Sequence, residues 1–215
     1  MSRTQKAALH DRPSLSLARA ATICPVSCPP LSFSLKPFAP SPTLAGVRIT
    51  AQVEGSPTGD LCLRYRLQAP KLSAWRLPAL QSPGRGEDLW QHTCFEAFVG
   101  KAHDSAYHEF NFSPSGQWAH YAFCAEREPA PMGRGLDVRL GIGLQFGADE
   151  LALQATVPCA AFPDLTAPLR LGLSAVLEGD DGKLHYWALA HPASRPDFHH
   201  PLSRCVALAW PSPLT

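Results

Sequence analysis

Residues 136–146 read Leu-Asp-Val-Arg-Leu-Gly-Ile-Gly-Leu-Gln-Phe, with an apolar residue at every second position. The side chains of a β-strand point alternately to its two faces, so a period of two predicts a strand with one buried face. Residues 151–157 repeat the alternation after the turn residues Gly147-Ala148-Asp149. The two segments therefore predict successive strands separated by a turn.

Shorter alternating segments lie on both sides of this stretch. Their apolar positions recur with the same period at residues 47–53, 61–67, 94–99, 107–112, 118–124, 171–177 and 184–190. The last two segments are joined by Glu178-Gly179-Asp180-Asp181-Gly182, a sequence typical of a β-hairpin turn. About nine or ten strands at short spacing predict an all-β fold, an antiparallel two-sheet β-sandwich, with a barrel as the less favoured arrangement.

The composition favours short strands over long helices. The chain has 215 residues with 22 prolines and 15 glycines, and both residue types disfavour helix interiors. Hydrophobic residues make up 45% of the chain, enough to build a core. The 19 basic and 18 acidic residues lack the basic excess of a nucleic-acid-binding protein, so we expect no nucleic-acid partner. No apolar run approaches the roughly 20 residues of a membrane span, and no membrane partner is expected.

The N-terminal segment differs from the rest of the chain. Residues 1–30 are basic and rich in Ser and Pro, and they show no sustained period. We predict that they form a disordered or poorly ordered tail, and that one domain spans residues 31–213. Arg19 interrupts the best candidate for the apolar part of a signal peptide, which predicts a cytoplasmic location.

Two neighbouring predicted strands carry the most informative polar side chains. Alternation puts Glu96 on one face of the first strand, and Glu109 and Asn111 on one face of the second. If the two strands pair across the turn between them, these three side chains share a face of the sheet. Arg64 and Arg66, on the polar face of an earlier strand, are expected to supply the counter-charge.

Such a polar face suits a polyhydroxylated ligand, because carboxylates accept and guanidinium groups donate hydrogen bonds to hydroxyls. The simpler alternative is a solvated sheet face with weak cross-strand ion pairs, and the spacing alone favours it. A third interpretation is a glycosidase pair formed by Glu96 and Glu109. That mechanism depends on the separation of two carboxyl groups in a cleft, which spacing does not supply, so we predict no enzymatic activity.

Histidine is concentrated near the C-terminus, where it suggests either a metal site or a packed loop. The residues are His185, His191, Asp197, His199 and His200. Imidazole and carboxylate groups bind metals, but this spacing matches no closed zinc pattern. A Pro-rich loop that packs over the end of the sandwich is the favoured interpretation.

Two of the five tryptophans are candidates for exposed stacking platforms. Trp90 follows a polar loop, and Trp187 has the parity opposite to Tyr186. An indole ring can cover the apolar face of a sugar, although core packing is an equal possibility for each of the two. Trp75 and Trp210 are expected to pack in the core or at an edge.

Known proteins share the motifs found in residues 89–123. The motif residues are Leu89-Trp90, Cys94-x-Glu96-x-Phe98 and Tyr107-x-Glu109-Phe110-Asn111-Phe112-Ser113-Pro114-x-Gly116-x-Trp118. In them the chain resembles the DOMON-like proteins related to family 9 carbohydrate-binding modules, and the resemblance covers residues 31–213. It implies an immunoglobulin-like or jelly-roll-like β-sandwich with a ligand site over one sheet and its adjoining loops. Members of the group bind sugars, often between two aromatic rings, or haem in the related cytochrome domains.

The resemblance also implies roles for single residues. Trp90 matches the first stacking residue, Glu96 matches the acidic residue that follows, and Trp187 is the candidate for the second stacking residue. Haem needs an axial pair such as Met and His, and Met132 stands in a predicted turn, so a sugar is favoured over haem and no cofactor is expected. We predict a non-catalytic β-sandwich that binds a small carbohydrate or similar polar ligand. The alternatives are a haem- or redox-cofactor domain and a protein-interaction module.

Overall fold

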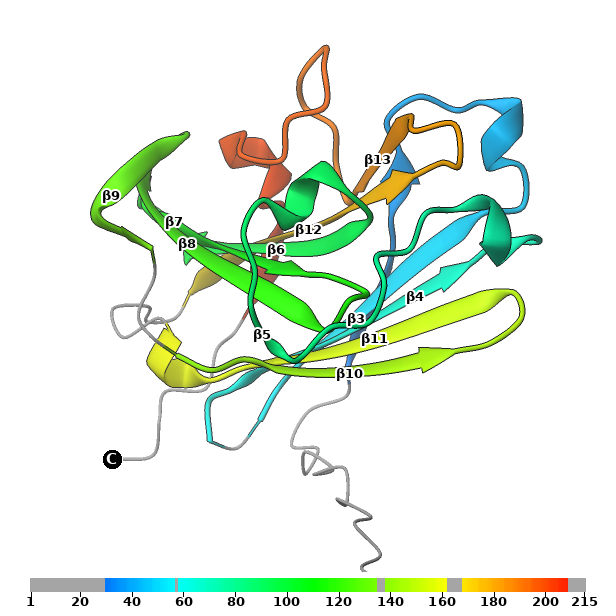
Figure 1. Ribbon diagram of the computed structural model, residues 1–215. Coiled ribbons are helices and arrows are strands. Elements are labelled where there is room, and N and C mark those ends of the chain that lie inside the picture. Colours follow the sequence, from blue (N-terminus) through cyan, green and yellow to red (C-terminus); the bar gives the residue numbers. More distant parts are fainter. Residues whose placement is uncertain (1–29, 57, 135–137, 162–167, 209–215) are drawn as a thin grey trace, which may run out of the picture.

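The chain folds into two stacked, mainly antiparallel β-sheets (Figure 1). The computed structural model describes residues 30–56, 58–134, 138–161 and 168–208. Almost all regular structure in these residues is β-strand, and the predicted β-sandwich is confirmed. The short 3-10 turns are η1 (Pro42–Leu44), η2 (Leu72–Ala74), η3 (Leu89–Gln91), η4 (Cys159–Ala161) and η5 (Pro201–Ser203). None of the helical segments in the described ranges has the length and apolar character needed to cross a bilayer.

Within the described residues the two sheets contain five and nine strands. The five-stranded sheet has the order β1 (Leu31–Ser34), β3 (Arg48–Gly55), β4 (Leu61–Gln68), β11 (Glu150–Val157) and β10 (Gly141–Phe146). The main path of the nine-stranded sheet is β2 (Lys36–Pro37), β13 (Leu184–Ala188), β12 (Leu169–Glu178), β6 (Cys94–Lys101), β7 (Tyr107–Phe112), β8 (Gln117–Ala125) and β5 (Gly84–Arg85). Off that path, β9 (Glu128–Arg134) pairs with β8 and β14 (Val206–Leu208) pairs with β12.

The first strand of the longest alternating stretch is shorter than predicted. The sequence predicts a strand over residues 136–146, but β10 begins only at Gly141, which lies opposite Thr156 of β11. β11 ends at Val157, so Val138 and Arg139 have no residue of β11 beside them to complete a ladder, and residues 136–137 lie outside the described ranges. Alternation describes which side chains are apolar, whereas a strand also needs a hydrogen-bonding partner.

Part of the predicted chain organisation falls outside the described ranges. The predicted tail is outside them up to residue 29, as is Trp210. The first described strand, β1, begins at Leu31. The predicted boundaries of the tail and of the domain therefore stay predictions.

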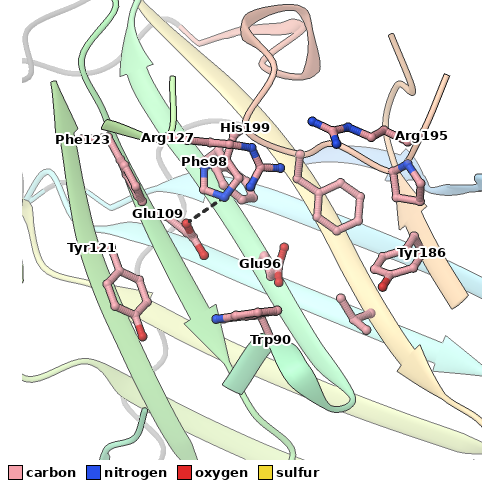
Figure 2. Close-up of a pocket in the computed structure, with 13 residues that line it drawn as sticks. Trp90, Glu96, Phe98, Glu109, Tyr121, Phe123, Arg127, Tyr186, Arg195 and His199 are labelled. Atoms are coloured by element: carbon pink, nitrogen blue, oxygen red, sulfur yellow. Dashed lines mark ion pairs between the residues drawn. The ribbon is translucent and has the colours of Figure 1, made fainter. Parts of the chain in front are cut away.

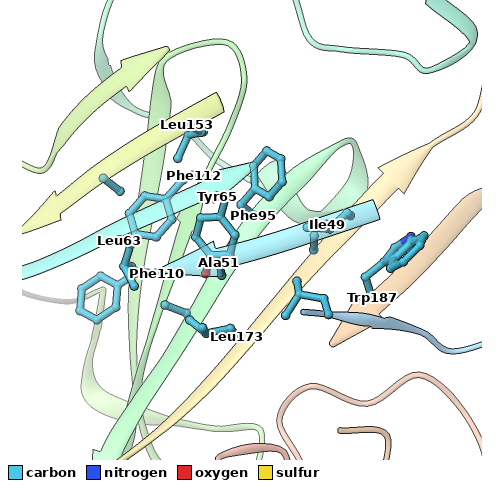
Figure 3. Close-up of a cluster of buried hydrophobic side chains, with 14 of the residues drawn as sticks. Ile49, Ala51, Leu63, Tyr65, Phe95, Phe110, Phe112, Leu153, Leu173 and Trp187 are labelled. Carbon is cyan, nitrogen blue, oxygen red and sulfur yellow. The ribbon is translucent and has the colours of Figure 1, made fainter. Parts of the chain in front are cut away.

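The core lies between the two sheets (Figure 3). On β6 and β7 the alternating aromatic residues Phe95, Phe110 and Phe112 point inward and are almost completely buried. They belong to the same core as Leu63 and Tyr65 of β4, in the opposite sheet. Because alternate residues point to opposite faces, the residues between them on β6 and β7 point away from this core.

That outer face of the nine-stranded sheet is not left open to solvent. The segment that follows β13 runs back across it, and η3 lies at its other side (Figures 1 and 2). Arg195, Phe198 and His199 of this C-terminal segment line a cavity together with side chains of the sheet. The sandwich therefore has a second buried layer, outside the core, in which polar side chains are enclosed.

Candidate functional site

A cavity of about 530 Å³ lies between the outer face of the nine-stranded sheet and the segments that cover it (Figure 2). Its size falls within the usual range of small-molecule sites, about 300–1,000 Å³. Both apolar rings and charged groups form its wall. The lining residues are Trp90, Glu96, Phe98, Glu109, Tyr121, Phe123, Arg127, Val176, Tyr186, Arg195, Pro196, Phe198 and His199.

Trp90 stands at the rim of the cavity with 48% of its surface exposed. It belongs to η3, which the chain enters through Asp88 in a left-handed conformation with a φ of 52°. The preceding residue of the turn, Leu89, is buried and anchors η3 against the sheet in a small cluster with Cys94 and Ala119. An anchored turn with a half-exposed indole ring is suited to contact a ligand from one side.

Glu96 lies on β6 and is only 2% exposed. It stands between Ser174 of β12 and Asn111 of β7 in the sheet register. The Ser174 hydroxyl donates a hydrogen bond of 3.0 Å to Oε2 of Glu96. Burial, and to a smaller extent the neighbouring Glu109, raises the pKa of Glu96 to about 8. Below neutral pH this carboxyl group is therefore protonated and can donate a hydrogen bond as well as accept one.

Glu109 on β7 is the second enclosed carboxyl group, with 5% of its surface exposed. The Asn111 side chain donates a hydrogen bond of 2.8 Å to Oε1, and Nε2 of His199 lies 3.6 Å from Oε2. Burial raises the pKa of Glu109 to about 7, although the Asn111 bond and the charge of Arg127 oppose the shift. The Oδ1 atom of Asn111 is buried and accepts no hydrogen bond from the described residues.

A hydrogen-bonded network holds the C-terminal segment over the cavity. The Tyr107 hydroxyl accepts a bond of 3.2 Å from the backbone N–H of Arg127 and lies 2.7 Å from Nδ1 of His199. The Arg127 guanidinium donates to Oδ1 of Asp197 at 2.9 Å. The Ser203 hydroxyl donates to the Asp197 backbone carbonyl at 3.0 Å. These bonds connect β7, the β8–β9 turn and the covering segment.

His199 is neutral in this network. Burial, followed by the charge of Arg127, lowers its pKa to about 4. The Tyr107 hydroxyl lies 2.7 Å from Nδ1, and Nε2 is the ring atom that faces Glu109. In the tautomer in which the hydroxyl donates to Nδ1, the ring proton is on Nε2 and the neutral ring presents a donor to Glu109.

Four of the seven predicted ligand residues lie at this cavity or next to it. Trp90, Glu96 and Glu109 line it, and Asn111 lies in the layer below, hydrogen-bonded to Glu109. The predicted pairing of the two motif strands is confirmed, with Glu96 opposite Asn111. The spacing in the sequence therefore brings Glu96, Glu109 and Asn111 together on one face, and their role in ligand binding stays a prediction.

The expectation that Arg64 and Arg66 neutralise these carboxylates is wrong. Both arginines lie on β4, between β3 and β11 in the five-stranded sheet, and point away from the cavity. They pair there with Glu54 and Glu150, each at 3.1 Å, and line a separate hollow of about 340 Å³. Alternation indicates which residues share a face of one strand but not which sheet the strand joins.

Trp187 is also placed differently from the expectation of a stacking platform. It is 3% exposed and belongs to the core between the sheets (Figure 3). In the register of β13 with β12 it lies opposite Ala175, which also faces the core, whereas Tyr186 lies opposite Val176 and lines the cavity. A shift of one residue along a strand changes the face, so the ring available to a ligand on β13 is that of Tyr186.

Several cavity residues escaped the sequence analysis. Arg127 and Arg195 lie in turns with no period, and Phe198 lies in the Pro- and His-rich segment, whose His199 the sequence suggests only as a metal ligand or part of a packed loop. This segment packs over the outer face of the nine-stranded sheet rather than over the end of the sandwich. Its composition was therefore a usable signal for a covering wall. No group of three or more His, Cys, Asp or Glu in the described residues is arranged to hold a metal ion. Met132 belongs to β9 rather than to the predicted turn.

Comparisons with known proteins relate the chain to others through its fold alone. No protein-family model matches the sequence, and no curated protein is significantly similar to it. A candidate carbohydrate-binding protein from Bacteroides uniformis superposes with a TM-score of 0.59 and 17% identity, over 80% of this chain and 83% of that one. A family 9 carbohydrate-binding module from Caldicellulosiruptor kristjanssonii, in complex with cellotriose, superposes with a TM-score of 0.52 and 8% identity, over 77% and 75% of the two chains. The chain has the β-sandwich fold of a family 9 module.

Proposed function

We propose that the chain is a non-catalytic, DOMON-like β-sandwich that binds a small carbohydrate in the cavity beneath the C-terminal segment. The observation that carries the proposal is the position of Trp90, a 48% exposed indole at the rim of a cavity that encloses two carboxyl groups. A cytoplasmic location stays a prediction.

The chemistry of the wall matches that of a sugar. A pyranose ring has apolar C–H faces and a polar edge of hydroxyls. Trp90 and Tyr186 offer rings for the faces, while Glu96 and Glu109 offer both donor and acceptor oxygens for the hydroxyls. The likeness in fold to proteins described as carbohydrate-binding supports the same ligand class.

In mildly acidic solution the state of the two carboxyl groups supports binding rather than hydrolysis. A retaining glycosidase needs one ionised carboxylate as a nucleophile and one protonated carboxyl group as an acid. Burial raises the pKa of Glu96 to about 8 and that of Glu109 to about 7, so in mildly acidic solution neither is ionised. A protonated pair can hold hydroxyl groups but does not supply the nucleophile.

Calorimetric titration with glucose, cellobiose and cellotriose tests the proposal. We expect the wild type to bind at least one of them, and Trp90→Ala to bind it about tenfold more weakly, since a contact with an aromatic ring contributes roughly 0.5–1.5 kcal/mol beyond the area that it buries. Trp90→Phe keeps a ring and should recover part of the affinity. Arg66→Ala, on the outer face of the other sheet, is the matched control and should bind as the wild type does. Equal affinity of wild type and Trp90→Ala would contradict the proposed site.

A further inference from the structure

The two carboxyl groups of the cavity make no contact with a cation among the residues that the structure describes. Glu96 accepts a hydrogen bond from the Ser174 hydroxyl at 3.0 Å. Glu109 accepts one from the Asn111 amide at 2.8 Å and lies 3.6 Å from the ring of His199, which is neutral. No lysine or arginine of the described residues therefore lies within ion-pair distance of either carboxyl group, and only the more distant charge of Arg127 acts on Glu109.

The two guanidinium groups at the cavity do not fill this role. Arg127 donates to Asp197 at 2.9 Å, so a carboxylate outside the cavity wall already balances its charge. Arg195 is exposed on the covering segment and makes no hydrogen bond or ion pair with the described part of the chain. In Figure 2 both guanidinium groups lie on the side of His199, away from Trp90.

An enclosed carboxylate without a counter-ion is costly, and its cost falls when a cation is placed beside it. The space between Trp90 and the two carboxyl groups is open to such a cation (Figure 2). Aromatic ring faces also attract cations, and Trp90, Tyr121 and Tyr186 all contribute rings to the cavity. The wall thus combines three features that favour a positively charged group: buried carboxyl oxygens, ring faces and the absence of a neighbouring cation on this side of the described cavity.

We propose that the ligand of this cavity is an amino sugar, with its free ammonium group between Glu96 and Glu109 and its ring against Trp90. The inference rests on the proposed carbohydrate-binding function and narrows it to sugars that carry an unsubstituted amine. N-acetylation of that amine removes the charge that the two carboxyl groups balance.

Binding of an ammonium group requires an ionised carboxylate, so it is coupled to proton release. The raised pKa values of Glu96 and Glu109 mean that the free site holds protons at pH 6, and the bound ammonium expels one of them. The other titratable or charged groups acting on the pair are Tyr65 of β4, Cys94 of β6, Tyr107 of β7, Tyr121 of β8, and Arg127 and His199 of the covering turns. The pKa values of the three tyrosines and of Cys94 are raised above their ordinary alkaline values and that of His199 is lowered to about 4, so these groups do not titrate between pH 6 and 8.

The test is calorimetric titration of the whole chain with glucosamine, N-acetylglucosamine and glucose at pH 6. At pH 6 the amine of glucosamine is protonated, because this pH lies well below the pKa of about 8 of an α-amino group. We expect glucosamine to bind about tenfold to a hundredfold more tightly than the two neutral sugars. Hydrogen bonds to a charged group contribute about 1.5–3 kcal/mol, which corresponds to a difference in affinity of this size. Titrations in two buffers of different ionisation enthalpy should give close to one released proton per bound glucosamine, and none for the neutral sugars.

Two isosteric variants and a control assign the effect to the carboxyl pair. Glu96→Gln and Glu109→Gln should each lose most of the preference for glucosamine over glucose, and most of the proton release on glucosamine binding. Glu150→Gln, on the outer face of the other sheet, should leave both quantities unchanged. The wild-type comparison of the three sugars needs no variant, so the test does not depend on the variants folding.

The outcomes separate the inference from the proposed function. Equal affinity for glucose and glucosamine without proton release overturns the inference and leaves carbohydrate binding intact. No binding of any sugar overturns both. If methylammonium binds as tightly as glucosamine and Trp90→Ala has no effect, the sugar ring contributes nothing and the amino-sugar assignment is wrong.

Discussion

The outer faces of the two sheets carry similar alternating polar residues but end in different environments. On the five-stranded sheet, Arg66 pairs with Glu150 at 3.1 Å, and their side chains are 57% and 33% exposed. On the nine-stranded sheet, Glu96 and Glu109 are 2% and 5% exposed, because η3 and the C-terminal segment cover them. Solvated ion pairs contribute little to stability, whereas enclosed carboxyl groups change their pKa and can bind a ligand. The polar residues of a strand face thus become candidate ligand-binding groups when loops enclose them.

The largest expected difference between the two faces is the pH dependence of stability. An acid whose folded-state pKa is raised holds more protons when folded than when unfolded, so the free energy of unfolding falls as pH rises between the two pKa values. For Glu96 that window runs from 4.5 to about 8. Glu96→Gln removes the penalty and should be more stable than the wild type at pH 8 by on the order of 3 kcal/mol.

Urea denaturation at pH 5 and pH 8 measures this effect. The variant and the wild type should have closer midpoints at pH 5, where the carboxyl group is protonated in the folded state. Glu150→Gln is the control on the exposed face and should show no such pH-dependent gain. A variant that is less stable than the wild type at pH 8 contradicts an uncompensated Glu96.

The second prediction tests the cover itself. Asp197 is 9% exposed, and its carboxylate binds Arg127 and the backbone N–H of His199. Asp197→Ala should therefore loosen the C-terminal segment and destabilise the fold by about 2 kcal/mol, less than for a fully buried pair because the Arg127 side chain is 52% exposed. Hydrogen exchange should increase in the covering segment and leave β3 and β4 protected. Unchanged exchange in that segment means that the pair does not anchor it.

The third prediction concerns the ring faces on β13. Tyr186 lines the cavity and Trp187 lies in the core, so the two neighbours should respond oppositely to truncation. Tyr186→Ala should weaken sugar binding severalfold with little loss of stability, as expected for loss of a stacking ring. Trp187→Phe should lower stability by about 1–2 kcal/mol and leave affinity nearly unchanged. Calorimetry and thermal unfolding of both variants check the assignment, and a binding defect confined to Trp187→Phe reverses it.

The smallest expected effect is on the exposed face. Arg66→Ala removes an ion pair with a half-exposed guanidinium and should change the free energy of unfolding by less than about 0.5 kcal/mol. Sugar affinity should be the same as that of the wild type. A loss of affinity in this variant would place a ligand on the five-stranded sheet.

The features that could be predicted from the sequence are those that depend on residues close together in the chain. Parity along a strand is local, so the facing of Glu96, Glu109 and Asn111 to one side of β6 and β7 follows from their spacing alone. The hairpin turn at residues 178–182 likewise locates the β12–β13 pair. These features need only near neighbours in the chain.

The wrong predictions concern residues whose position depends on pairing with segments far away in the chain. Arg64 has the right parity, but β4 pairs with β3 and β11, a choice made by long-range packing. The alternation around Trp187 does not show which face of β13 is buried. Only the register of β13 with β12, which places Trp187 opposite Ala175, shows that Trp187 faces the core. The enclosure of Glu96 depends on a segment about 100 residues later in the chain, around His199, which alternation of β6 cannot indicate.

A crystal structure of the chain grown with glucosamine tests the central claim most directly. The account predicts one sugar in the cavity of the nine-stranded sheet, with its ring against Trp90 and its amine within hydrogen-bond distance of Glu96 or Glu109. Sugar bound instead in the hollow beside Arg64 and Arg66, or a cavity without sugar at a concentration that saturates binding in solution, would contradict it.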